Sequence, residues 1–205
     1  MYIVATSERP WGKAVAHRAP SRTTVSLTIP LRTARLTLRD FAPNDSDAIH
    51  AYASDPEVTR FMSYGPRTVA ETRAYLERML ASQRENPRLI WELGVAVTAD
   101  GRLVGACDLT LENAQETDLG FVFLRDVWGM GYATEAARTL VRAGFEQLGL
   151  NRISSTCDVS NGASARVLEK AGLQREATLE QHKYAKGQWW TSFLYAVRRD
   201  EWVPQ

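Results

Sequence analysis

The chain has 205 residues, of which 44% are hydrophobic and 24% charged, as is ordinary for a folded globular protein. The formal net charge is +1, so no strong field favours nucleic acid or a membrane surface as a partner. No apolar run reaches the ~18 residues that a membrane span needs. We expect one domain with a full core, and its two cysteines, Cys107 and Cys157, packed inside strands in a reducing, cytoplasmic setting.

The first 26 residues differ from the rest of the chain. They carry Arg, Lys, Ser and Thr, a single acid and no sustained periodicity. They also lack the apolar region of a secretory signal. We expect a flexible tail over residues 1–26, with a transit-like segment as the alternative, and a single domain over residues 27–205.

The next part of the chain predicts one strand followed by helices. Residues 35–41 alternate between apolar and polar, which is typical of a strand. Asn44 or Asp45 is placed to cap a first helix, with acids in its first turn. A second short helix is expected over residues 54–62, where a proline stands near the start.

A third helix begins with a capping-box pair, Thr68 and Glu71, and ends before Asn86-Pro87. Its apolar positions recur at helical period and share one face. These positions are Thr72, Tyr75, Leu76, Met79 and Leu80.

The rest of the chain alternates strands and helices. Asp100-Gly101 separates two β-rich runs and predicts a hairpin. The remaining elements are expected in the order strand, helix, strand, helix, strand, strand. They cover residues 117–124, a helix after Thr134, 152–159, 163–172, 174–184 and 189–199. The order predicts an α/β fold in which one mixed sheet is covered by helices.

A short glycine loop, Gly129-Met130-Gly131, lies between an expected strand and an amphipathic helix. The first turn of a helix leaves unpaired main-chain N–H groups, and glycines allow more of them to converge. Such a loop suits a phosphate or pyrophosphate. It lacks the lysine of a P-loop and the third glycine of a dinucleotide fold. A plain strand-to-helix turn is the alternative.

The stretch "WGMGYATEA" resembles the acyl-CoA pyrophosphate loop of the GCN5-related N-acetyltransferase (GNAT) superfamily, in its ribosomal-protein-alanine acetyltransferase (RimJ/RimL-like) branch. Trp128 stands where that loop usually has Gln or Arg. Three further segments resemble the branch in the same order: "LRTARLTLRDF" with "SDPEVTRFM", the run from "LVGACDLTLE" to the loop, and "VSNGASARVLEKAGL". The resemblance covers nearly everything from residue 31 onward.

The resemblance implies a seven-stranded, splayed sheet flanked by helices, with acetyl-CoA as cosubstrate. The pantetheine arm would add to the strand at Val122, Phe123 and Leu124. Asn161 and Ser164 would contact the same arm or its turn. The diphosphate would lie on the loop, whose residues are Trp128, Gly129, Met130, Gly131, Tyr132, Ala133 and Thr134.

Acetyl transfer to an amine needs a base for the amine and an acid for the leaving thiolate. Asp118 is the first candidate for the base and Glu92 the second, and a water chain would also serve. The family's usual tyrosine acid falls at Leu168, so Ser164 is the natural replacement, with local helix capping as its alternative. We expect no metal site.

The acceptor side is expected to include Arg60, Tyr64, Arg67 and Trp190. Ser192 stands where relatives commonly carry Asp, which leaves the acceptor contacts open. The acceptor is then a protein N-terminal amine or a small-molecule amine of the aminoglycoside type. A non-catalytic acyl-CoA sensor is the third possibility. Nucleic acid and membrane are not expected as partners, and the chain would work as a monomer or homodimer.

Overall fold

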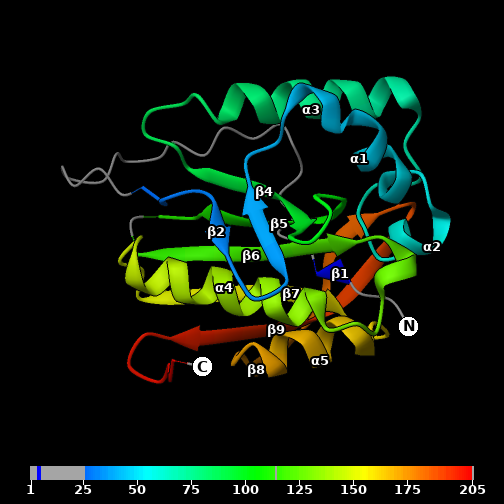
Figure 1. Cartoon of the computed structure of the whole chain (residues 1–205). Coiled ribbons are helices and arrows are strands. Elements are labelled where there is room, and N and C mark those ends of the chain that lie inside the picture. The colour runs from blue at the N-terminus through cyan, green and yellow to red at the C-terminus, as the bar shows by residue number, and fades with distance from the viewer. Residues whose placement is uncertain (1–3, 6–25, 114, 205) are drawn as a thin grey trace.

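The computed structural model describes residues 4–5, 26–113 and 115–204. One mixed sheet runs through this part of the chain, with helices on both faces (Figure 1). Three helices cover one face: α1 (Ser46–Ala53), α2 (Pro56–Thr59) and α3 (Val69–Ser82). Two helices cover the other: α4 (Tyr132–Glu146) and α5 (Gly162–Lys170). The α/β class predicted from the element order is confirmed.

The strands lie in the order β2-β3-β4-β5-β6-β7-β9-β8, and β1 pairs separately with β6. Seven strands of four or more residues form most of the sheet in the described residues. They are β3 (Leu36–Arg39), β4 (Ile90–Val97), β5 (Leu103–Leu111), β6 (Glu116–Phe123), β7 (Arg152–Asp158), β8 (Gln174–Ala185) and β9 (Gln188–Arg198). Two strands of two residues each, β1 (Val4–Ala5) and β2 (Leu31–Arg32), extend it. Both are too short for a hydrophobic period to predict.

The predicted N-terminal tail, residues 1–26, lies outside the described residues apart from Val4–Ala5 and Ser26. The 3₁₀ turns η1 (Pro43–Asp45) and η2 (Arg125–Val127) precede α1 and α4. No helix in the described part of the chain has the length and apolar character to cross a bilayer.

Of the helix caps predicted for α3 and α1, the structure confirms the first and shows a different role for the second. The Thr68 Oγ1 accepts a hydrogen bond from the Glu71 N–H, and the Glu71 carboxylate accepts one from the Thr68 N–H, which confirms the capping box of α3. Asp45 precedes α1, but its side chain does not cap it. It pairs with Arg39 at 2.7 Å instead, because the η1 turn directs the carboxylate back toward β3.

The sheet separates two apolar cores. The larger one packs α4 and α5 against the sheet, and the smaller one packs α1–α3 against the other face. The apolar face predicted for α4 is confirmed, since Leu140 and Val141 are fully buried and Phe145 is 1% exposed. Each such side chain stabilises the fold by roughly 1.5–3 kcal/mol.

β6 and β7 run side by side for only three residues. Their parallel register joins Glu116 to Arg152 and ends at Asp118 and Ser154. The other edge of β7 pairs with β9 along the whole strand, while the edge of β6 beyond Asp118 pairs with β1 at Val122 and Phe121. The parallel pair therefore opens at Asp118, as the splayed sheet predicted.

Candidate functional site

The glycine loop lies at the end of β6 and leads into α4. Gly129 and Gly131 have φ angles of +84° and +81°, a region that L side chains rarely adopt. Gly131 is the N-cap of α4, which begins at Tyr132, slightly earlier than the helix predicted after Thr134. A Cβ at Gly129 would meet open space. The loop thus exposes main-chain N–H groups beside the positive end of a 15-residue helix.

The other loop residues divide into anchors and exposed positions. The Trp128 indole donates a hydrogen bond to the Phe123 carbonyl oxygen at 2.9 Å, which ties the loop to the end of β6. Ala133 is buried, Tyr132 and Thr134 are partly buried, and the Met130 side chain is 51% exposed. Trp128 therefore fixes the loop through a main-chain contact.

The edge of β6 that faces the opening offers main-chain groups from alternate residues. The Leu124 N–H donates to the Val104 carbonyl in β5 at 2.9 Å, so Leu124 does not offer its N–H to the opening, contrary to the prediction. By the alternation of an antiparallel pair, Phe121 and Phe123 face the opening with their main-chain groups. β1 lies there and also contacts β7 and α5.

The start of α5 borders the same opening, since α5 contacts β1. Asn161 is its N-cap, and the Asn161 Oδ1 accepts a hydrogen bond from the Ser164 N–H at 3.2 Å. Both side chains are buried, at 1% and 0% exposure. The side chain that caps this helix is therefore that of Asn161.

Three carboxylates share the sheet face that α1–α3 cover. Glu92 in β4 lies directly opposite Asp108 in β5, and Thr110 in β5 lies opposite Asp118 in β6. Cross-strand partners and residues two apart point to one face of a sheet. The Thr110 hydroxyl donates to Asp108 Oδ2 at 3.2 Å. Asp118 stands where β6 and β7 part, so this carboxylate row reaches the opening.

Glu92 has an unusual environment for a carboxylate. The Tyr75 hydroxyl of α3 donates a hydrogen bond to Glu92 Oε1. Burial, and then the negative charge of Asp108, raise the pKa of Glu92 to about 8, although Arg67 acts in the opposite direction. The Tyr52 hydroxyl is buried nearby without a hydrogen-bond partner in the described residues. Burial and the charge of Glu92 raise the Tyr52 pKa well above its ordinary value.

The predicted acceptor residues gather in two places. The Arg67 guanidinium lies 3.9 Å from the Tyr64 ring centroid and 4.3 Å from that of Tyr75, beside Glu92. Burial is the main reason why the Tyr64 pKa rises to about 12. Trp190 lies in the β8–β9 hairpin.

Arg60 belongs with this hairpin rather than with Arg67. The Lys186 Nζ lies 5.8 Å from the Trp190 ring and donates to the Thr59 and Arg60 carbonyls of the α2 segment, at 2.6 and 3.3 Å. Lys186 thereby holds the β8–β9 hairpin against the α2 segment. This contact brings Trp190 to the segment that carries Arg60.

Three residues of this region escaped the sequence analysis. Asp108 is the single acid in the otherwise apolar run of β5, which is a signal that could have found it. Tyr52 and Tyr75 read as ordinary core aromatics. Only the structure shows that both hydroxyls lie close enough to Glu92 to interact with its carboxylate.

Comparisons with known proteins find relatives of this chain. A family model described as "Acetyltransferase (GNAT) domain" matches residues 35–174. The chain is 31% identical over 177 residues to the uncharacterized N-acetyltransferase p20 of Bacillus licheniformis, covering 84% of this chain and 98% of that protein. It is 28% identical over 173 residues to the uncharacterized N-acetyltransferase YnaD of Bacillus subtilis, with the same coverage.

Solved structures share the fold. A GNAT-family acetyltransferase from Bacillus anthracis superposes with a TM-score of 0.76 at 29% identity, covering 83% of this chain and 99% of that one. RimL, a ribosomal L7/L12 α-N-protein acetyltransferase in complex with coenzyme A, gives 0.73 at 18% identity, covering 84% and 98%. A spermidine N-acetyltransferase from Vibrio cholerae, in complex with CoA and spermine, gives 0.71 at 16%, covering 82% and 98%.

Proposed function

Because the chain belongs to the GNAT acetyltransferase family, we propose that it transfers the acetyl group of acetyl-CoA to a primary amine of a small cationic molecule. One observation carries the proposal. The strand β6 leads into a glycine loop suited to an anion at one end and has a carboxylate, Asp118, toward the other, where the sheet opens. An activated acyl donor and an amine fit the two ends of this strand.

The residues present suit the donor. Glycines at 129 and 131 leave no side chain between the diphosphate and the main-chain N–H groups. The pantetheine arm would pair with the edge of β6 at Phe121 and at the N–H of Phe123, whose carbonyl already accepts the Trp128 indole N–H. When bound, acetyl-CoA supplies the thioester, an acetyl group already activated for attack by an amine. An arm at this edge and β1 exclude one another.

Two side chains at the opening would handle the protons. Asp118 is placed to accept the proton of the attacking amine, because it marks the last paired residue before β6 and β7 separate. Ser164, buried at the start of α5, would donate to the leaving sulfur. Geometry selects Asp118 before Glu92, since Glu92 lies two strands away from the opening.

Glu92 fits the acceptor better than it fits the base. With Asp108 opposite and the rings of Tyr75 and Tyr64 nearby, it forms an acidic, aromatic-lined patch. The Arg67 guanidinium already lies over both rings, so the two carboxylates, once ionised, would attract an alkylammonium group through charge. This acidic face supports a small cationic amine over a protein N-terminus.

We further propose that residues 27–205 form the catalytic domain and act in the cytoplasm, in keeping with two buried free cysteines, Cys107 and Cys157. Either a monomer or a homodimer would suit this chemistry.

An acceptor panel tests the function. Purified protein and acetyl-CoA are mixed with polyamines, amino sugars and peptides that begin with Ala or Ser, and free thiol release is followed. We expect turnover with a small cationic amine. Turnover with the peptides alone would overturn the acceptor class. Binding of acetyl-CoA without turnover of any amine would make the chain a cofactor sensor.

A further inference from the structure

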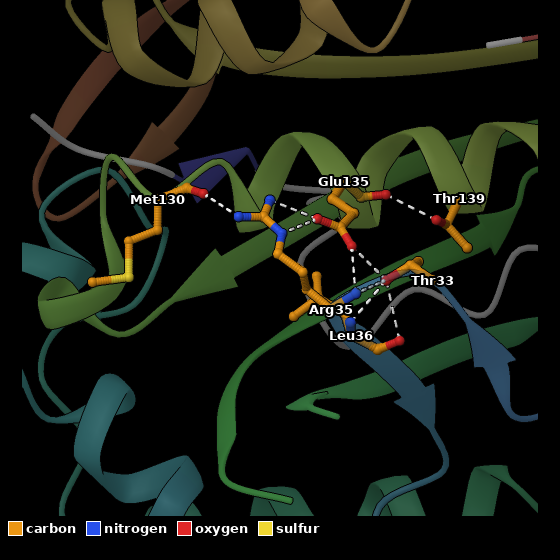
Figure 2. Close-up of polar contacts among 6 residues, drawn as sticks. All are labelled: Thr33, Arg35, Leu36, Met130, Glu135 and Thr139. Atoms are coloured by element: carbon orange, nitrogen blue, oxygen red, sulfur yellow. Dashed lines mark hydrogen bonds and ion pairs between the residues drawn. The ribbon is translucent and has the colours of Figure 1, made fainter. Parts of the chain in front are cut away.

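One arginine connects the turn between β2 and β3 to the glycine loop (Figure 2). The Arg35 Nη1 donates to the Met130 carbonyl oxygen at 2.9 Å. The Nε and Nη2 of the same guanidinium contact Glu135 Oε2 at 2.7 and 2.6 Å. Glu135 lies in the first turn of α4. A side chain 95 residues upstream of Met130 therefore joins the loop to the helix that follows it.

Glu135 is held from several directions. Its Oε1 accepts hydrogen bonds from the Thr33 hydroxyl at 2.5 Å and from the Arg35 main-chain N–H at 3.1 Å. Burial raises the pKa of Glu135, but the bonds from Thr33 and Arg35 outweigh it and leave the pKa below its ordinary value. The carboxylate therefore stays charged and neutralises Arg35. The guanidinium is already compensated and need not serve as a charge for the diphosphate.

The bond to Met130 constrains one peptide unit. In a trans peptide the carbonyl oxygen and the N–H of the next residue point in opposite directions. With the Met130 oxygen held by Arg35, the Gly131 N–H points away from the guanidinium. The glycines at 129 and 131 have few steric limits on φ and ψ. Without Arg35, this peptide plane could rotate and withdraw its N–H.

We infer that Arg35 is a positioning residue for the diphosphate of acetyl-CoA, because it locks the Met130–Gly131 peptide in the orientation that presents the Gly131 N–H to an anion. The inference rests on the proposed function, which supplies the ligand. Arg35 acts through the peptide and does not touch the ligand.

Binding constants for two ligands, coenzyme A and S-acetylpantetheine, separate positioning from general damage. Coenzyme A carries the diphosphate and S-acetylpantetheine does not, so only coenzyme A depends on the loop. We would measure both by calorimetry in wild type, Arg35→Lys and Arg35→Ala, with thermal melts for each. Arg102→Ala is the matched control, because Arg102 is an exposed arginine that pairs with Asp126 just before the loop.

Lysine keeps the charge of Arg35, but it lacks the planar fork that reaches Met130 and Glu135 together. We expect both Arg35 variants to weaken coenzyme A binding about tenfold, the effect of losing one hydrogen bond to a charged group. Their S-acetylpantetheine affinity, and both affinities of Arg102→Ala, should stay within roughly twofold of wild type.

Two results would overturn the inference. One is Arg35→Lys binding coenzyme A as tightly as wild type, and the other is an equal loss for both ligands. If Arg35→Ala does not fold, the lysine variant alone decides. A wild-type chain that binds no coenzyme A would instead remove the proposed function itself, and the inference with it.

Discussion

The donor end and the acceptor face of this molecule are built in different ways. At the donor end, the glycine loop and the edge of β6 present main-chain groups, and side chains such as Arg35 and Trp128 serve to hold that backbone. At the proposed acceptor face, side chains would make the contacts themselves: Glu92, Asp108 and the tyrosines around them. Backbone recognition depends on where glycines stand, whereas side-chain recognition depends on what the tertiary structure brings together.

The largest expected effect lies at the donor end. Gly131→Asp introduces a side chain at a positive φ and brings a carboxylate next to Arg35, in the loop that would bind the diphosphate. We expect acetyl-CoA affinity to fall by about 100-fold, from repulsion and lost N–H contacts. Gly101→Asp is the control, because Gly101 has a similar φ of +74° in an open hairpin turn. Equal losses in both variants would show that strain alone is responsible.

The next prediction separates the chemical step from the binding of acetyl-CoA. Asp118→Asn keeps the shape of the side chain and removes the proposed base, so kcat should fall by about 100-fold. The KM for acetyl-CoA should change little, because the loop is untouched. Thiol release against varied acetyl-CoA measures both constants. A normal kcat would transfer the base role to Glu92 or to water.

The acceptor face should reveal itself through pH. Since the Glu92 pKa is raised to about 8, kcat/KM for a cationic amine should rise several-fold from pH 7 to 9 as Glu92 ionises. Asp108→Asn removes a negative charge that raises the Glu92 pKa. Glu92 should then ionise at lower pH, and the rise of kcat/KM should move to lower pH with it. In Glu92→Gln, the only remaining rise of kcat/KM with pH should be the one caused by deprotonation of the substrate amine. Identical profiles in all three proteins would contradict a role for Glu92 in binding.

The same shift predicts a stability change of known sign. The folded pKa of Glu92 lies above its ordinary value of 4.5, so its contribution to stability is full below pH 4.5 and is lost as pH rises through about 8. Glu92→Gln should therefore raise the Tm relative to wild type at pH 9, by about 2–4 °C for each kcal/mol recovered. At pH 5 the two should melt nearly together. A Tm gain that is equal at both pH values would contradict the assignment.

The smallest effect concerns β1. Deleting residues 1–25 removes the strand that pairs with Val122 and Phe121, so acetyl-CoA should bind roughly two- to fivefold more tightly. Ala5→Pro keeps the chain length but removes one main-chain donor, and should shift affinity the same way by less. Calorimetry measures both. Unchanged or weaker binding after the deletion would show that β1 does not compete.

The sequence predicted the donor end well because its signals are local. The glycine loop and the face of α4 each depend on residues a few positions apart, and the structure confirms these elements. The opening of β6 from β7 came from the family resemblance, and the structure shows it.

The acceptor face could not be predicted in the same way. Asp100-Gly101 indicates the hairpin, but the strands close at Val97 and Arg102. A bulge at Val95/Ala96 then shifts the register by one residue. That shift sets Glu92 opposite Asp108. A one-residue change of register turns every side chain of a strand to the other face of the sheet. Neither hydrophobic periodicity nor turn chemistry specifies which register the strands adopt.

The Arg35 contact was missed for a related reason. It joins residues 95 positions apart, and nothing in the spacing of an exposed arginine in the turn before β3 indicates its partner. Only the pairing of β3 with β4, and the position of α4 beneath them, brings it to the loop.

The free edge of β6 has room for one extended partner at a time. β1 belongs to the same chain, so it meets that edge at an effective concentration that does not depend on how much protein is present. A soluble donor has to exceed this constant intramolecular competitor before the edge is filled by donor instead. Half occupancy would then need a higher acetyl-CoA concentration than an uncovered edge requires, by a constant factor that the polypeptide itself sets.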